Sequence, residues 1–383
     1  MPKLIRITTV PMALRYLLPG QMRFMAENGF DVLMISADGK ELKDVIEKED
    51  CPHIIVPMTR KITPLQDLRC LIKLIRIFKK EKPDIVHTHT PKAGILGMLA
   101  AKCCGVKVRI HTVAGLPMLV EKGWKRRLLR FVEKRTYAAA NQVWPNSNSL
   151  LQVINAQKLC DPAKLSVIAK GSTNGIDVNY FDKTTLDAQL LDQIKASINY
   201  YAQYKYLLFI GRLVVDKGIV ELLNVFAALQ QTNEALRLIL VGDHEAALDP
   251  LPAETIHQIE NNSSVIHINW TDDVKYYMSV ADLFVFPSHR EGFPNVLLQA
   301  GAMELPVVCS RIEGNVDIVT HNKTGLIFDC GDQQQMQRQI EFALNNPGQS
   351  RSMAASLLNK VRADYRRENI WQNILEAYKS LVN

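Results

Sequence analysis

The chain has 383 residues, 47% of them hydrophobic and 22% charged, and its formal net charge is +7. This length exceeds what one hydrophobic core usually organises, so it predicts two domains, and the composition excludes a disordered or fibrous protein. Seven cysteines without a CxxC pair argue against a disulfide framework or a zinc motif and predict reduced thiols.

The N-terminal segment is predicted to be a buried strand and not a signal peptide. Lys3 and Arg6 precede apolar residues, as in a signal peptide, but Pro11 and Arg15 interrupt the apolar run. The longest apolar segment, near 93–106, is too short to cross a bilayer. These features predict a cytoplasmic protein without a membrane-spanning helix.

Short β-branched runs then alternate with helical patterns along the chain. In the first half, strands are expected at 3–10, 30–37, 84–89, 106–113, 142–146 and 164–169. Helices are expected between some of these strands, at 17–29, 65–82 and 93–105. A second series of strands is expected at 204–211, 236–243, 264–269, 281–288 and 305–310. This alternation predicts an α/β protein with parallel sheets covered by helices on both faces.

A turn-rich segment separates the two series of strands. It predicts an N-terminal domain over 1–171, a linker over 172–200 and a C-terminal domain over 201–365. A last helix over 366–383 is expected to pack back toward the N-terminal domain. Two such Rossmann-like sheets would face each other across a cleft and bind ligands beyond the carboxyl ends of their strands.

The positive charge is concentrated in the segment 121–140, EKGWKRRLLRFVEKRTYAAA. On a helix, one face would carry Trp124, Leu128, Phe131 and Val132, and the opposite face Arg126, Arg127, Arg130 and Lys134. One interpretation is a surface helix that packs its apolar face on a sheet. The other is a helix over 122–135 that docks on anionic lipid, where each basic residue contributes about 1 kcal/mol. No nucleic-acid-binding signature accompanies the charge, so no nucleic acid is expected as a partner.

The stretch LLFIGRLVVDKGIVELLNVF places two cations after a buried strand. The strand ends at Gly211, which permits a tight turn, and a helix is expected to begin near Lys217. Arg212 and Lys217 would then lie at a helix N-terminus, where the helix dipole also favours an anion. A diphosphate suits that place, and two solvated surface charges are the alternative. The spacing does not match a Walker motif.

The stretch ADLFVFPSHREGFPNVLLQAGA repeats this arrangement. Glu291 and Gly292 follow a buried strand, and Pro294 is expected in the first turn of the next helix. The unpaired main-chain N–H groups between Phe293 and Val296 could meet a phosphate or a hydroxyl. Gln299 would lie inside that helix, where an exposed or helix-packing role is the alternative.

Four motifs in order resemble a family 4 retaining glycosyltransferase of the GT-B fold. They are DIVHTHTPKAGILGMLAA, NGIDVNYF, FIGRLVVDKG and ADLFVFPSHREGFPNVLLQA, and the resemblance runs from the first strand to about residue 330. The sequence looks closest to the bacterial branch that builds capsule, O-antigen and other lipid-linked glycans. None of the four motifs is specific to this family by itself, but the occurrence of all four in this order is.

The resemblance implies roles for individual residues. Arg212 and Lys217 would hold the donor diphosphate, and Glu291 would bind hydroxyls of the transferred sugar as the first acid of the E-x7-E motif. Gln299 replaces the second acid, which usually binds the ribose, so it would accept a hydrogen bond without charge assistance. The implied catalytic residues are Arg212, Lys217 and Glu291. The implied donor-binding residues are Gly211, Gly292, Phe293, Pro294, Asn295, Val296 and Gln299.

The sequence departs from the family pattern at two further places. Pro11 stands where many members have a Gly-Gly turn, and Ala114 stands where many have a histidine near the reacting sugar. The role of that histidine does not transfer to His111, three residues earlier. The candidate acceptor or cleft contacts are His87, His89, Lys92, His111 and Asn174. No carboxylate cluster or DxD motif accompanies the histidines, so no metal is expected.

The resulting expectation is a metal-independent retaining glycosyltransferase without a cofactor. It would move a hexose or N-acetylhexosamine from a nucleotide sugar, UDP by preference, to a polyprenyl-diphosphate-linked acceptor. The segment 122–135 would rest on the inner leaflet of the cytoplasmic membrane. Two alternatives remain: a UDP-sugar 2-epimerase on the same fold, and a catalytically impaired scaffold protein with Ala114 and Gln299 as signs of decay.

Overall fold

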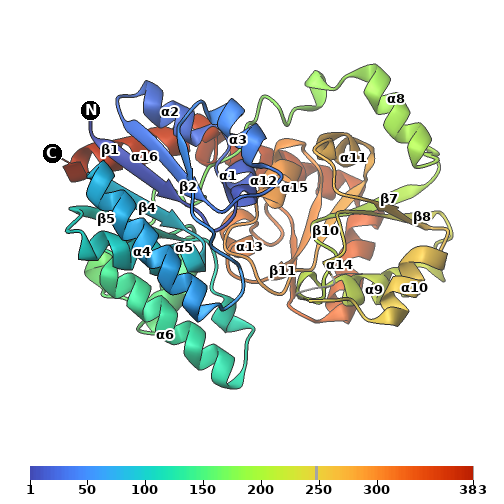
Figure 1. Ribbon diagram of the computed structural model, residues 1–383. Helices are drawn as coiled ribbons and strands as arrows, with labels where there is room; N and C mark the ends of the chain where they lie inside the picture. The colour runs from blue at the N-terminus through green and yellow to red at the C-terminus, as the bar shows by residue number, and fades with distance from the viewer. Residues whose placement is uncertain (246–248, 383) are drawn as a thin grey trace. The chain divides into compact units, whose positions relative to one another are not determined.

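The computed structural model describes residues 1–245 and 249–382 and divides the chain into two compact units (Figure 1). The first unit comprises Met1–Gly175 and the segment from Arg367 onward, and the second unit comprises Ile176–Arg366. Each unit contains one parallel six-stranded sheet. The predicted α/β class is therefore confirmed.

The two sheets share one strand order. The first sheet runs β3 (His53–Ile55), β2 (Asp31–Ser36), β1 (Lys3–Ile7), β4 (Ile85–His89), β5 (Val108–Val113), β6 (Gln142–Pro145). The second runs β12 (Leu326–Asp329), β11 (Val307–Arg311), β10 (Leu283–Phe286), β7 (Lys205–Ile210), β8 (Leu236–Val241), β9 (Val265–Ile268). The order reverses between β1 and β4 and between β7 and β10, the switch points where doubly wound sheets bind their ligands.

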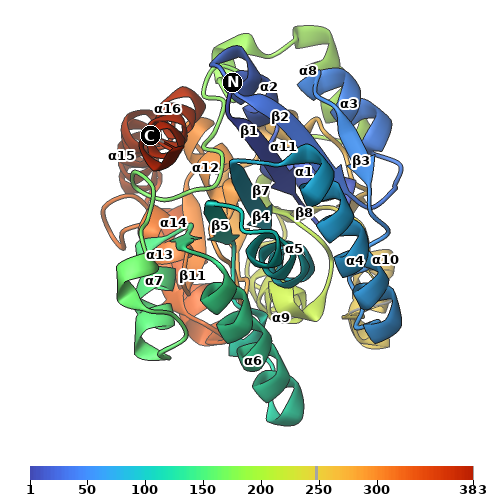
Figure 2. The same cartoon turned by 60° about the vertical axis from the view of Figure 1, so that its left-hand side comes forward.

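Helices cover both faces of the first sheet. One face carries α1 (Pro11–Leu17), α2 (Gln21–Glu27), α3 (Leu42–Glu49) and α16 (Arg367–Val382). The other carries α4 (Pro64–Glu81), α5 (Pro91–Cys103), α6 (Gly123–Ala139) and α7 (Asn148–Ala156). Successive strand residues point to opposite faces, so Leu4 packs with the first group while Ile5 packs with the second. In Figures 1 and 2, α4, α5 and α6 follow one another, with α5 in contact with both neighbours.

The second sheet is buried in one continuous apolar core. Its helices are α8 (Ala188–Ser197), α9 (Ile219–Gln230), α10 (Ala253–Asn261), α11 (Val274–Val280), α12 (Asn295–Ala302), α13 (Asn315–Ile318), α14 (Gln333–Asn345) and α15 (Pro347–Asp364). The single-turn helices of the chain are η1 (Pro117–Leu119), η2 (Pro162–Lys164), η3 (Lys183–Thr185) and η4 (Val215–Lys217). The strands of this sheet read as near-continuous apolar runs because both faces are covered.

Several elements differ from the sequence-based expectation. The helix expected at 17–29 is the shorter α2, and α1, which ends at Leu17, was not expected. The strand expected at 164–169 does not form, and Leu165 makes only an isolated bridge with Val143. The short strands β3 and β12 were not expected, because three or four residues carry too little periodicity to be recognised.

The segment 172–200, expected to be a linker, contributes to the second unit. Ile176, Val178 and Phe181 are buried in the second core, and α8 lies within this range. These buried residues are hard to recognise in the sequence because they are irregularly spaced within a segment that is rich in turn residues.

A buried polar network joins α16 to the first sheet. The Tyr378 hydroxyl lies 2.5 Å from Nη1 of Arg6 and 2.5 Å from Nδ1 of His87. Arg6 also donates to Oε1 of Gln21. Burial lowers the pKa of Arg6 and raises that of Tyr378 to about 12, so the phenol stays neutral beside the guanidinium. These hydrogen bonds fix the position of α16 on the first sheet more specifically than apolar packing alone would.

Candidate functional site

The two charged motifs of the second unit meet at the switch point of its sheet. Strands β7 and β10 are paired neighbours, with Leu283 opposite Leu207. Gly211 and Arg212 directly follow β7, and the segment 287–291 directly follows β10. The parallel strands therefore deliver both motifs to one edge of the sheet.

Two close backbone approaches fix the loops at this edge. Gly218 has φ +72°, and a Cβ at this position would stand 2.3 Å from the Pro287 carbonyl oxygen. Gly314 has φ +81°, and a Cβ there would stand 2.4 Å from the Gly292 carbonyl oxygen. Both positions require glycine for backbone conformation and for space. The segment after β10 is thus held from two sides.

Three ion pairs connect the start of α9 to residues 289–291. Nη2 of Arg290 lies 2.6 Å from Oδ2 of Asp216, and Nζ of Lys217 contacts Oε1 of Glu291. The third pair joins Nε2 of His289 to Oε1 of Glu221 at 3.0 Å. The Glu291 carboxylate also accepts a 3.0 Å hydrogen bond from Ser288 Oγ. These contacts bring together two residues of the predicted catalytic set, Lys217 and Glu291.

The His289–Glu221 pair shifts the pKa of both partners. The hydrogen bond to Glu221 raises the pKa of His289 above its usual value, and burial opposes that shift. The hydrogen bond from His289 lowers the pKa of Glu221. The charged form of each partner therefore stabilises the charged form of the other.

Arg212, the third predicted catalytic residue, is paired with Glu245 and keeps 41% of its side chain exposed. It leaves the sheet from β7, and Lys217 follows five residues later at the end of η4. The Lys217 side chain is less exposed, at 15%. An anion beyond the strand ends would meet two positive side chains and the N-terminal end of α9.

The start of α12 lies beside Glu291, as expected. Pro294 occupies the N-cap position and α12 begins at Asn295, one residue later than predicted. Gly292 and Phe293 are buried, whereas Asn295, Val296 and Gln299 are half-buried. The N–H of Leu297 in the first turn donates to the Pro294 carbonyl, and Gln299 lies in the second turn.

Four of the five candidate acceptor contacts have partners inside the first unit. His87 is 1% exposed and has its ring nitrogens against Tyr378 and Thr112. His111 is buried with Nδ1 2.8 Å from Thr88 Oγ1. Lys92 is paired with Asp67 at 2.6 Å. These interior partners support a structural role, and contact with an acceptor stays a prediction.

Asn174 is the fourth of these residues and is also buried. Its Oδ1 accepts hydrogen bonds from Gln21 Nε2 at 2.8 Å and from Trp371 Nε1 at 2.6 Å. Its Nδ2 donates to the Pro19 carbonyl at 3.1 Å. Asn174 therefore joins α2 to α16 just before the chain enters the second unit.

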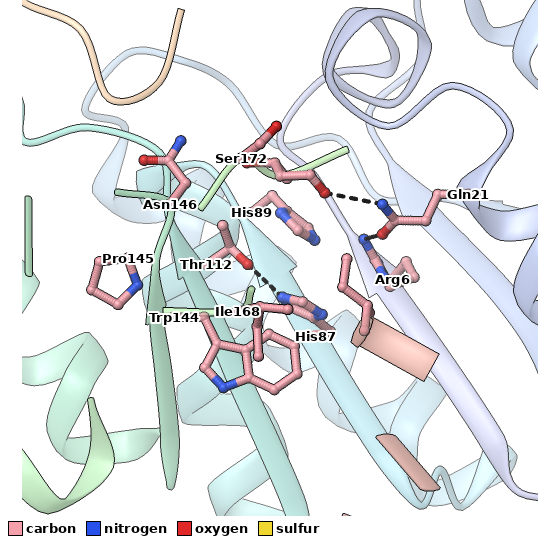
Figure 3. A pocket seen from close by; sticks show the side chains of 12 residues that line it. Arg6, Gln21, His87, His89, Thr112, Trp144, Pro145, Asn146, Ile168 and Ser172 are labelled. Carbon is pink, nitrogen blue, oxygen red and sulfur yellow. Dashed lines mark hydrogen bonds between the residues drawn. The ribbon is translucent and has the colours of Figure 1, made fainter. Parts of the chain in front are cut away.

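His89 differs from the other four candidates in its hydrogen bonding. It lines a cavity of about 20 Å³ at the carboxyl ends of β4, β5 and β6, together with Arg6, Gln21 and Thr112 (Figure 3). It is buried and stacks on His87 at 4.3 Å. Within residues 1–245 and 249–382, neither of its ring nitrogens has a hydrogen-bond partner. The cavity has room for about one water molecule.

Sequence reasoning missed the residues that hold the predicted ones in place. Asp216, Glu221 and Arg290 lie within quoted motifs, but their ion pairs join residues far apart in the chain and leave no local signal. The hydroxyl pair of Thr9 and Thr90, 2.7 Å apart at the switch point of the first sheet, was missed for the same reason.

Helix α6 buries a different face from the one expected. Trp124 and Phe131, predicted to share its packed apolar face, are 67% and 54% exposed. The residues that pack inward include Tyr137 and Glu133, and burial raises the Glu133 pKa to about 7. The expected packing of Trp124 and Phe131 on the sheet is therefore wrong, because contact with α5 selects the opposite side of the helix.

No helix within residues 1–245 and 249–382 is long and apolar enough to cross a membrane. No group of three or more His, Cys, Asp or Glu side chains there could hold a metal ion.

Each of the two units contains a segment that matches a known protein family. The description "Glycosyl transferase 4-like domain" covers residues 19–171, and "Glycosyl transferases group 1" covers residues 192–357. A solved structure of Anabaena HepE with UDP and glucose aligns at TM-score 0.82 with 17% identity, over 99% of this chain and 100% of that one. A glycosyltransferase from Rickettsia africae aligns at TM-score 0.81 with 19% identity, over 100% and 99%. The fold is GT-B.

Curated relatives identify the family. The capsular polysaccharide biosynthesis glycosyltransferase CapM of Staphylococcus aureus is 32% identical over 99% of this chain and 97% of its own length. The UDP-Gal:alpha-D-GlcNAc-diphosphoundecaprenol alpha-1,3-galactosyltransferase of Escherichia coli is 27% identical over 82% and 79%. The chain belongs to the group 1 glycosyltransferases with a family 4-like N-terminal domain, which confirms the expected resemblance.

Proposed function

We propose that the protein is a retaining glycosyltransferase that moves a hexose or N-acetylhexosamine from a UDP-sugar to a polyprenyl-diphosphate-linked acceptor in capsule or related surface-glycan synthesis. The observation that carries the donor side is the meeting of Arg212, Lys217 and Glu291 at the switch point of the second sheet. The acceptor class follows the relatives from Staphylococcus aureus and Escherichia coli, whose names specify capsular polysaccharide and a diphosphoundecaprenol-linked sugar.

In the proposed reaction the bond between the anomeric carbon and the β-phosphate oxygen breaks, and its electron pair stays on that oxygen. Arg212, Lys217 and the start of α9 stabilise the charge that develops on the diphosphate. The acceptor hydroxyl approaches the anomeric carbon from the leaving-group side and forms the new bond there. Its proton passes to a phosphate oxygen, and the configuration is retained. This path requires positioning and charge stabilisation, but no protein nucleophile, metal or cofactor.

Helix α6 is proposed to hold the enzyme against the inner membrane leaflet. It carries six Lys or Arg residues and one Glu, and that Glu is buried. Trp124 and Phe131 are exposed among the cations, a combination typical of interfacial helices. On the same side of the first sheet, α4 exposes Leu65 and Leu68. A lipid surface would cover these apolar side chains and attract the cations.

The donor site is tested by thermal unfolding of the purified protein with UDP, GDP and ADP. Ligand at a hundred times its dissociation constant should stabilise the folded protein by about 2.7 kcal/mol. Arg212→Ala and Lys217→Ala should each lose the shift, while Lys323→Ala, which removes an exposed cation of the same unit, should keep it. No shift with any nucleotide would favour the scaffold alternative. Conversion of UDP-sugars without an acceptor would reveal the epimerase.

The membrane role is tested with the triple variant K125Q/R126Q/R127Q. We expect activity on a short soluble acceptor to be unchanged, and activity on a lipid-linked acceptor in anionic vesicles to be lost. The control K323Q/R338Q/R351Q removes the same charge from exposed positions of the second unit and should behave as wild type. Equal losses on both acceptors would refute docking through α6.

A further inference from the structure

We infer that Glu291 acts as an exchangeable partner of Lys217, so that the donor site discriminates between a sugar-bearing nucleotide and the nucleoside diphosphate product. The inference rests on the proposed function of this site. A diphosphate that binds Lys217 competes with Glu291 for this ammonium group, and only a donor that carries a sugar offers Glu291 new partners.

The Lys217–Glu291 pair is shielded from water. The two side chains are only 15% and 16% exposed. The carboxylate oxygen that contacts Lys217 also accepts the hydrogen bond from Ser288, whose side chain is buried. Separating a shielded pair without replacing the lost partner leaves a poorly solvated charge, which is costly. An incoming ligand must therefore satisfy both halves of the pair.

Neighbouring cations are held by other carboxylates. Arg290, adjacent to Glu291 in the chain, is paired with Asp216, and His289 is paired with Glu221. Across the site, Arg212 is paired with Glu245. Displacement of Glu291 from Lys217 by a phosphate would thus leave this carboxylate close to an anion, with its neighbouring cations engaged. That arrangement is repulsive.

The transferred sugar resolves this repulsion. Sugar hydroxyls donate hydrogen bonds to a carboxylate, and such charge-assisted bonds are stronger than neutral ones. A nucleotide sugar therefore satisfies Lys217 through its diphosphate and Glu291 through its hydroxyls. A nucleoside diphosphate satisfies Lys217 alone. After transfer, Glu291 returns to Lys217 and competes with the product diphosphate, which favours product release.

The test is isothermal titration of UDP into wild type, Glu291→Gln, Lys217→Ala and the double variant. Glutamine keeps the shape of Glu291 but removes the charge that competes for Lys217. We expect Glu291→Gln to bind UDP roughly tenfold more tightly than wild type, a change of about 1.4 kcal/mol. The matched control Glu260→Gln removes an exposed carboxylate from α10 and should bind UDP as wild type does.

The double variant isolates the interaction between the two side chains. If Glu291 acts by occupying Lys217, the gain from Glu291→Gln disappears in the Lys217→Ala background. A Glu291→Gln variant that binds UDP no more tightly than wild type, or a gain that persists without Lys217, would overturn the inference and leave the donor site intact. If folded wild type binds GDP or ADP in place of UDP, the same comparison applies with that nucleotide. Binding of none of the three would overturn both the donor site and this inference.

Discussion

Gly218 lies directly against Pro287: a Cβ on Gly218 would stand 2.3 Å from the Pro287 carbonyl oxygen. This contact lies one residue from Lys217 and four residues from Glu291. It holds the turn before α9 against the segment after β10, so the ion pairs between these segments form across a fixed distance. A backbone contact therefore sets the geometry in which the charged side chains meet.

Gly218→Ala should destabilise the second unit and weaken nucleotide binding. An alanine in this left-handed conformation costs about 1 kcal/mol before the clash with Pro287 is counted. For a unit of this size we expect the melting temperature to fall by at least about 2–4 °C. Differential scanning calorimetry checks this, with Gly348→Ala as the control because nothing lies within 4 Å of its added Cβ. Equal melting temperatures for the two variants would contradict the prediction.

Gln299→Glu should tighten binding of UDP by restoring the second acid of the E-x7-E motif. A charge-assisted hydrogen bond from a ribose hydroxyl is stronger than a neutral one by about 1 kcal/mol, or roughly fivefold in affinity. Titration calorimetry measures the change. The 2′,3′-dideoxy analogue of UDP lacks the hydroxyls and should bind both proteins alike. An equal gain with the analogue would show that Gln299 does not contact the ribose.

Tyr378→Phe should lower the stability of the first unit. The substitution removes the hydroxyl shared by Arg6 and His87 and leaves buried polar atoms without that partner, at a cost of about 1–3 kcal/mol. Chemical denaturation followed by tryptophan fluorescence measures the loss. Tyr201→Phe removes a hydroxyl from a side chain that is 53% exposed and should be neutral. A neutral Tyr378→Phe would mean that the network contributes nothing to stability.

The first unit should lose stability as the pH falls from about 6.5 to 4. Burial lowers the pKa of His53 and of His111 to about 4, and it also lowers the pKa values of His87 and His89 well below their usual value. In this pH range the unfolded chain binds more protons than the folded chain, so stability rises with pH. Melting temperatures across this range check the sign. A flat profile would contradict it.

The Glu133 carboxyl should contribute the opposite pH dependence, and Glu133→Gln should remove that contribution. Burial raises the Glu133 pKa to about 7, so the wild-type carboxyl is charged in the folded protein at pH 8 at a cost on the order of 3 kcal/mol. The cost falls below about 1 kcal/mol at pH 5, where the folded carboxyl is protonated. The variant should therefore be more stable than wild type at pH 8 and nearly equal to it at pH 5. A gain that does not change with pH would indicate improved packing.

The sequence predicts the donor side of the molecule better than the interior of the first unit. Gly211, Arg212 and Glu291 lie in the segments that follow the buried strands β7 and β10, so local patterns identify them and parallel topology brings them to one edge. The contact of Lys217 with Glu291 spans 74 residues and has no local signal. Their meeting follows from the strand order of the sheet.

The interior of the first unit depends on contacts that are still more distant in sequence. His87 meets Tyr378 across 291 residues, and Asn174 meets Trp371 across 197. From the sequence alone, a histidine at a strand end suggests a ligand contact, because the sequence does not reveal its hydrogen-bond partner in the interior. Similarly, a helical wheel shows that α6 has an apolar side, but contact with α5 decides which side is buried. Trp124 and Phe131 are exposed for that reason.

The return of α16 to the first unit has a consequence for synthesis on the ribosome. The first 175 residues are made early, yet Ile370, Ile374 and Tyr378 complete their core. At 5–20 residues per second, about 10–40 s of further elongation separates the two parts. During that interval the second unit can fold while the part of the first sheet that α16 covers remains exposed. The first unit is therefore begun first and completed last. A nascent chain that lacks the last turns of α16 would contain every residue of the candidate donor site, but the core of its first unit would be incomplete.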